Sequence, residues 1–132
     1  MSPPVIYADI DMHNLLAEHR AWLHLTIAIV SEVVATTALK HADGYSRFLP
    51  TAIVFAGYVN AFWWLSLALR TIPLGIAYAI WSGAGIVLVA LLGLLLYGQR
   101  LDLKAMLSIG LILVGVILFS MDRAADERRL AP

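Results

Sequence analysis

The sequence predicts an all-α membrane protein in which four short helices each cross the bilayer once. The first observation is composition: 61% of the 132 residues are hydrophobic and the mean hydropathy is +0.84, whereas soluble domains contain roughly 45–50% apolar residues. The second is that charged residues divide the chain into four long apolar runs. The third is that these runs lack the alternating polarity of membrane barrel strands, which are about 10 residues long.

Each apolar run is long enough for one crossing, which needs roughly 17–25 residues. The runs are residues 21–39, 48–69, 71–99 and 105–121. Turn-forming residues lie between them, with Gly44 and Pro50 in the first connection and Pro73 in the second. We therefore expect antiparallel neighbouring helices at about 21–39, 48–69, 74–97 and 104–121.

The two ends of the chain are polar. Residues 1–20 are predicted to be an N-terminal extension, flexible or forming a short surface helix, and Pro3 and Pro4 favour a disordered start. Residues 122–132 are predicted to be a C-terminal tail. Residues 21–121 then form one transmembrane domain, and the first run is not a cleaved signal because a mixed-charge lead precedes it and further spans follow it.

Basic residues are divided almost equally between the two sides of the membrane. One side would carry Arg20, Arg70, Arg123, Arg128 and Arg129, and the other Lys40, Arg47, Arg100 and Lys104. The positive-inside rule needs an asymmetry to set orientation. Five basic residues against four is almost no asymmetry. The chain could therefore insert in one fixed orientation or in both.

Composition also excludes several classes of function. The net charge is zero, which gives no reason to expect a nucleic-acid partner. The chain has no cysteine, so it has no disulfide or thiolate site, and we predict no metal site. The sequence contains no nucleophile–base pair or phosphate-binding loop. We therefore expect neither an enzyme nor a bound cofactor.

Glu32 is the leading candidate for a functional residue. It is the only formally charged residue within the apolar runs. A charge at bilayer depth costs at least ~2.5–3.5 kcal/mol, so an acid there indicates a functional site. Ala28, Ile29 and Thr36 lie on or beside the same helix face. Because low polarity favours a neutral carboxyl group, Glu32 would hold a proton and release it to a cation, unless it is only a structural hydrogen-bonding group.

Aromatic side chains form the second candidate cluster. Tyr58 and Trp63 lie on the second expected span, and Tyr78 and Trp81 share one face of the third. Aromatic faces attract cations by ~0.5–2 kcal/mol each. A carboxylate with such rings suits a lipophilic cation. The alternative is an interfacial belt of Trp and Tyr at headgroup level.

Glycines in the third and fourth spans form the third signal. Gly83 and Gly85 would permit a kink or a close helix approach. Gly110 and Gly115 form a small-residue stripe suited to a helix–helix contact. Four short helices enclose little volume, so we expect a dimer as the minimum working unit.

Four segments together resemble the small multidrug resistance family of bacterial membrane transporters. They are SEVVATTALK around Glu32, GYSRFLP in the first connection, IPLGIAYAIWSGAGIVL in the third span and GQRLD after it. The resemblance extends from about Trp22 to about Met121. It implies an antiparallel homodimer of dual topology in the bacterial inner membrane, which uses the proton gradient to export small cationic drugs or antiseptics.

The resemblance also implies roles for individual residues. It makes Glu32 the shared proton and substrate site, and it places the substrate-binding aromatics at Tyr58, Trp63, Tyr78 and Trp81. It places a helix kink at Gly83 and Gly85 and a dimer contact around Gly110 and Gly115.

The chain is similar to the multidrug branch of that family. The guanidinium-exporting branch has Gly and Trp where this chain has Ile29 and Ala35. Trp22 and Ala61 depart from the multidrug pattern, which often has Tyr and Ser there, and Asn60 has no assigned role. A guanidinium exporter, one subunit of a paired heterodimeric polyamine or drug exporter, and a membrane protein that does not transport remain alternatives.

Overall fold

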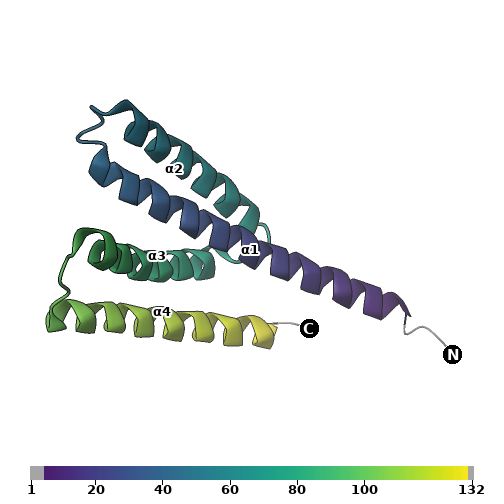
Figure 1. The fold of residues 1–132 in the computed structure, drawn as a ribbon. Coiled ribbons are helices and arrows are strands. Elements are labelled where there is room, and N and C mark those ends of the chain that lie inside the picture. Colours follow the sequence, from purple (N-terminus) through teal and green to yellow (C-terminus); the bar gives the residue numbers. More distant parts are fainter. Residues whose placement is uncertain (1–4, 131–132) are drawn as a thin grey trace.

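The structure is a computed structural model that describes the backbone of residues 5–130 and the side chains of residue 12 and residues 14–122. Figure 1 shows the helices α1 (Val5–His41), α2 (Phe48–Ala68), α3 (Leu74–Tyr97) and α4 (Leu103–Leu130). Within this described part the four helices are long and apolar enough to cross a membrane, and there is no strand. The predicted fold class, an all-α protein with four membrane-spanning helices, is confirmed.

α1 is one uninterrupted helix of 37 residues that contains most of the polar extension as well as the first apolar run. No glycine or proline occurs between Val5 and His41, so nothing in the backbone breaks the helix where it leaves the apolar run. Its N-terminal half projects beyond the other helices (Figure 1). The helix ends at a tight turn in which Asp43, Gly44 and Tyr45 have positive φ angles of 48°, 64° and 68°.

The other helix ends follow from local sequence. Pro50 lies in the first turn of α2, where its missing N–H costs no helical hydrogen bond. α3 ends at Gly98, which has a φ of 60° and donates its N–H to the carbonyl of Gly93. Asp102 caps α4, since its Oδ1 accepts the N–H of Ala105 at 2.8 Å.

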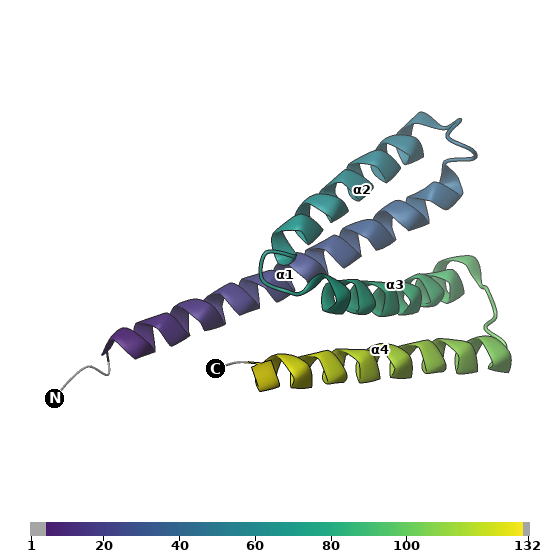
Figure 2. The same cartoon turned by 180° about the vertical axis from the view of Figure 1, so that it is seen from behind.

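α1 and α2 form a closely packed antiparallel hairpin, and α3 connects this hairpin to α4 (Figures 1 and 2). The buried core is rich in alanine, which lets helices approach closely. The fully buried alanines are Ala28, Ala35, Ala42, Ala61, Ala68 and Ala77. A close approach occurs at Gly57, where an added Cβ would lie 2.8 Å from the Cβ of Ala35 and 3.2 Å from the carbonyl oxygen of Ser31.

α4 contributes least to the core of the single chain. None of the most apolar window of α4, within Leu103–Asp122, is buried. Its contact with the rest of the chain runs through α3, where Val116 and Leu113 lie against Gly83. The remaining apolar surface of α4 is free to contact lipid or another chain.

Candidate functional site

A cavity of about 610 Å³ opens beside Glu32 between α1, α2 and α3. Its size lies within the roughly 300–1,000 Å³ that is typical of sites for drug-sized ligands. Most of its wall is apolar or aromatic. Its lining residues are Glu32, Tyr58, Phe62, Tyr78, Trp81, Ser82, Gly85, Ile86, Val89, Ala90 and Gln99. Among these described residues Glu32 is the only formally charged one, so its charge governs what the cavity attracts.

A chain of hydrogen bonds holds the Glu32 carboxylate in place. The Thr36 hydroxyl, one turn further along α1, donates to Glu32 Oε1 at 2.6 Å. The Tyr58 hydroxyl on α2 lies 3.0 Å from the same Thr36 oxygen. Because Thr36 has only one hydroxyl proton and directs it at Glu32, Tyr58 must donate to Thr36 while the carboxylate is ionised. The order of donation is therefore Tyr58 to Thr36 to Glu32.

Aromatic rings from α2 and α3 form another part of the cavity wall. The Trp81 ring lies 5.6 Å from the Phe62 ring and 6.3 Å from the Tyr78 ring, measured between centroids. The rings are tilted by 57° and 50°, which is the arrangement that aromatic pairs prefer over a flat stack. They provide π faces close to a carboxylate, which is the combination that binds organic cations.

Gly85 supplies the space between the carboxylate and these rings. A Cβ at this position would lie 3.5 Å from Glu32 Oε2 and 3.9 Å from Trp81 Cδ1. Any larger side chain would therefore project between the acid and the indole. This packing role accounts for one of the two predicted kink glycines, while Gly83 lies against α4. Both lie inside the uninterrupted helix α3.

The structure brings together four of the five residues proposed for proton and substrate binding. Glu32, Tyr58, Tyr78 and Trp81 line the cavity, whereas Trp63 does not and is 66% exposed on another face of α2. Of the predicted neighbours, Thr36 bonds directly to Glu32. The others do not line the cavity: Ala28, Ile29 and Ala61 are buried in helix contacts and Trp22 is partly exposed.

An added Cβ at Gly110 or Gly115 would have no described atom within 4 Å apart from its chain neighbours and the nearby backbone of α4. Gly115 is exposed and Gly110 is half-buried. The single chain thus leaves both glycines available to another helix, and their predicted dimer contact stays a prediction.

Six lining residues were not assigned to the site from the sequence, namely Phe62, Ser82, Ile86, Val89, Ala90 and Gln99. Phe62 extends the aromatic wall, and Ser82 follows Trp81 on α3. Gln99 reaches the cavity from the α3–α4 connection, and its Oε1 occupies the space above Gly93, 2.6 Å from where a Cβ would be. A glycine at 93 is consistent with this contact, but spacing alone does not predict that the connection folds back.

Asn60 has a structural partner on α1. Its Nδ2 donates to Ser31 Oγ at 2.7 Å, and its Oδ1 accepts from Trp64 Nε1 at 3.1 Å. Ser31–Asn60 and Thr36–Tyr58 thus link the same two helices on either side of the Gly57 contact. These two hydrogen bonds fix the rotation of α2 that directs Tyr58 toward Thr36.

Comparison with known proteins agrees with this arrangement. The family model described as Small Multidrug Resistance protein matches residues 20–112. The chain belongs to the small multidrug resistance family. The match includes Glu32 and every residue that lines its cavity.

Relatives within the small multidrug resistance family cover most of the chain. The multidrug transporter PA4990 of Pseudomonas aeruginosa is 55% identical over 100 residues, 76% of this chain and 91% of the relative. The quaternary ammonium compound-resistance protein QacE of Escherichia coli is 47% identical over 102 residues, 77% of this chain and 93% of the relative. The multidrug resistance protein EbrB of Bacillus subtilis is 42% identical over 108 residues, 82% of this chain and 92% of the relative.

Membership in the small multidrug resistance family and the four helices together identify a multi-pass protein of the bacterial inner membrane. The family match begins at residue 20. The part of α1 before residue 20 lies outside the family match.

Proposed function

We propose that this protein is a proton-coupled antiporter that exports lipophilic, aromatic or quaternary-ammonium cations. The observation that carries the proposal is the single carboxylate of Glu32 in a cavity walled by aromatic rings. Relatives named for resistance to quaternary ammonium compounds, ethidium bromide and multiple drugs support the substrate class.

Glu32 would bind the proton and the substrate in turn. A carboxylate in apolar surroundings is costly unless a cation or a proton neutralises it. Either ligand satisfies the same need, so binding of one displaces the other. That competition couples proton transport to cation transport, because the site changes the side of the membrane to which it opens while it holds either a proton or a cation.

The hydrogen-bond chain would reverse with each exchange. While Glu32 is ionised, Thr36 donates to it and Tyr58 donates to Thr36. A protonated Glu32 becomes a donor, so Thr36 can accept from it and donate to Tyr58. Thr36 and Tyr58 thereby satisfy Glu32 in both states without moving apart.

The aromatic rings would set the substrate class. Trp81, Tyr78 and Phe62 offer apolar faces and few hydrogen-bond acceptors. Such walls suit a large cation with a delocalised or shielded charge. A small guanidinium ion would leave its donors unpaired here, which disfavours the guanidinium alternative.

The working unit is proposed to be an antiparallel homodimer. The cavity of one chain is open, with Tyr78 63% exposed, and a second copy would enclose it and supply a second carboxylate. The nearly equal basic charge on the two sides supports insertion in opposite orientations.

The proposal is tested by proton release from purified, detergent-solubilised protein on addition of tetraphenylphosphonium. We expect release of between one and two protons per dimer from the unaltered protein, and none from Glu32→Gln, which also fails to bind the cation. Glu18→Gln removes an exposed acid outside the cavity and serves as the matched control, with release unchanged.

Retained binding or proton release in a folded Glu32→Gln protein would contradict the proposal. A folded, dimeric, unaltered protein that releases no protons to tetraphenylphosphonium, yet exchanges guanidinium in a flux assay, would establish the alternative substrate class instead.

A further inference from the structure

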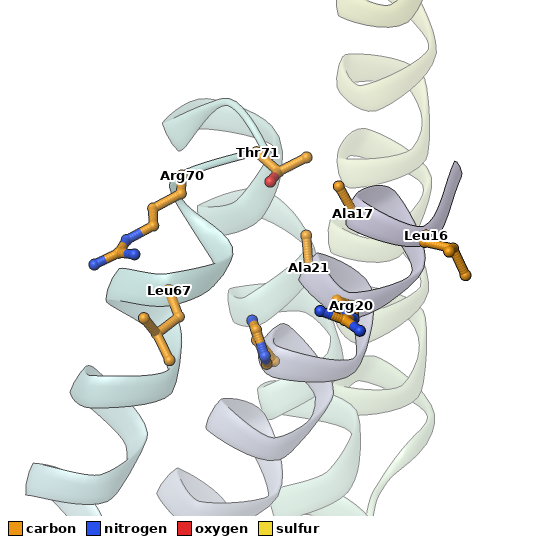
Figure 3. A pocket seen from close by; sticks show the side chains of 8 residues that line it. Leu16, Ala17, Arg20, Ala21, Leu67, Arg70 and Thr71 are labelled. Carbon is orange, nitrogen blue, oxygen red and sulfur yellow. The ribbon is translucent and has the colours of Figure 1, made fainter. Parts of the chain in front are cut away.

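A second cavity of about 430 Å³ lies where α1 and α2 reach the bilayer surface, and it shares no lining residue with the Glu32 cavity. It is formed by α1, the last turn of α2 and the α2–α3 connection (Figure 3). Its lining residues are Leu16, Ala17, Arg20, Ala21, His24, Leu67, Arg70 and Thr71.

The charge of this second cavity is entirely basic. Arg20 and Arg70 both line the cavity and are exposed, and Figure 3 shows the guanidinium of Arg70 directed away from Arg20. No acidic residue lines the cavity, and among the described side chains neither arginine has a carboxylate partner. Two exposed arginines that line one hollow without a lining acid favour an anion there, and phosphate matches the fork of a guanidinium group.

The depth of the second cavity in the membrane favours a lipid headgroup over free phosphate as its ligand. Arg20 immediately precedes the first apolar run and Arg70 immediately follows the second, so both lie at the boundary where lipid headgroups begin. The remaining wall includes the apolar side chains of Leu16 and Leu67. Free phosphate gains nothing from an apolar wall, whereas the glycerol and upper acyl chain of a lipid do.

Part of one wall comes from residues outside the family match. Leu16 and Ala17 precede residue 20, where the family match begins. They reach the cavity because α1 continues without a break through the extension. Across the cavity the His24 ring is held against Trp64, with centroids 5.2 Å apart, so the wall on that side is fixed by packing.

We propose that this pocket binds the phosphate headgroup of an anionic phospholipid, with Arg20 and Arg70 as the phosphate ligands. Basic pockets between membrane helices bind anionic headgroups in this way. The N-terminal extension thereby acquires a role, since it completes the apolar wall. The proposal does not depend on the chemistry of Glu32.

The test is lipid binding to the full-length protein in detergent, followed by native mass spectrometry during titration with phosphatidylglycerol, phosphatidylcholine or inorganic phosphate. We expect phosphatidylglycerol to bind at least ~10-fold more tightly than phosphatidylcholine, the difference expected of one charge-assisted contact. Arg20→Gln with Arg70→Gln should abolish that preference. Arg47→Gln with Arg100→Gln removes the same charge outside this pocket, and should retain it.

A second variant tests the shape of the pocket separately from its charge. Ala17→Leu keeps both arginines but fills the hollow, and we expect it to lose the preference as well. Unaltered helix content and thermal unfolding temperature show that each variant is folded. An equal preference in the Arg20/Arg70 variant and the Arg47/Arg100 variant would overturn the proposal. Phosphate binding without any preference for phosphatidylglycerol would overturn the lipid as its source.

Discussion

At the scale of single residues, the site depends on one carboxylate and the groups that contact it. Thr36 donates a hydrogen bond to the Glu32 carboxylate, and the Tyr58 hydroxyl bonds to Thr36. Gly85 leaves the space in which a cation reaches both the acid and Trp81. Each of these contacts can be removed separately, which makes their roles distinguishable.

Tyr58→Phe keeps the ring and removes the hydroxyl that donates to Thr36. Without this hydroxyl the Thr36 oxygen has no donor while Glu32 is ionised, so the carboxylate is held less firmly for a cation. At neutral pH we expect tetraphenylphosphonium affinity to fall ~2–10-fold, equivalent to one hydrogen bond of ~0.5–1.5 kcal/mol. Isothermal titration measures the change, and Tyr45→Phe, in the exposed first connection, is the control. An unchanged affinity would mean that the hydrogen-bond chain does not act on Glu32.

Gly85→Ala places a methyl group 3.5 Å from Glu32 Oε2. That distance is an ordinary contact, so the fold should tolerate it and the thermal unfolding temperature should stay within a few degrees. Binding of a bulky cation should weaken strongly, because the methyl group occupies space between the acid and Trp81. Parallel measurement of unfolding and cation affinity checks this, and equal affinity would show that substrate does not enter between these groups.

At the scale of helices, the α1–α2 hairpin is the rigid element that aims Tyr58. Gly57 permits the close approach, and the Ser31–Asn60 and Thr36–Tyr58 hydrogen bonds flank it. α3 then contributes Tyr78, Trp81 and Gly85 across the cavity. The site therefore depends on the separation between two helices as much as on its own side chains.

Gly57→Ala should push α1 and α2 apart, because its Cβ would lie 2.8 Å from that of Ala35. Overpacking of this kind costs typically ~1–3 kcal/mol, so thermal unfolding should occur at a lower temperature and cation affinity should fall with it. Gly75→Ala is the control, since its Cβ would meet only the Phe119 ring at 3.4 Å. Equal stability of the two variants would contradict the tight hairpin.

At the scale of the whole molecule, one chain leaves its site open and α4 uncovered. The described part of α4 contacts α3 near Gly83, while the positions of added Cβ atoms at Gly110 and Gly115 are not occupied by side chains of the described chain. Small residues on an uncovered membrane helix suit helix–helix contact. The proposed dimer would use this surface and close the cavity.

Gly115→Leu should therefore weaken dimerisation, because the larger side chain separates helices that small residues allow to touch. We expect the dimeric fraction, measured by energy transfer between labelled chains in lipid, to fall several-fold, with a smaller fall for Gly115→Ala. Helix content should be unchanged. An undiminished dimer in both Gly110→Leu and Gly115→Leu would place the contact elsewhere.

The sequence by itself determined the fold class and the position of the charged site. Four apolar runs require four helices, because backbone groups in lipid must be satisfied within the segment. A lone acid within those runs is visible without coordinates. The motifs around it were sufficient for the family, which the comparisons confirm.

Only the tertiary structure decided which side chains meet. Trp63 and Tyr58 lie on the same helix, yet the rotation of α2 turns Tyr58 toward Thr36 and leaves Trp63 exposed. The partner of Asn60, the return of Gln99 to the cavity and the second pocket beside the extension likewise depend on helix rotation and separation. Those quantities arise from contacts between distant segments, which spacing along one helix does not encode.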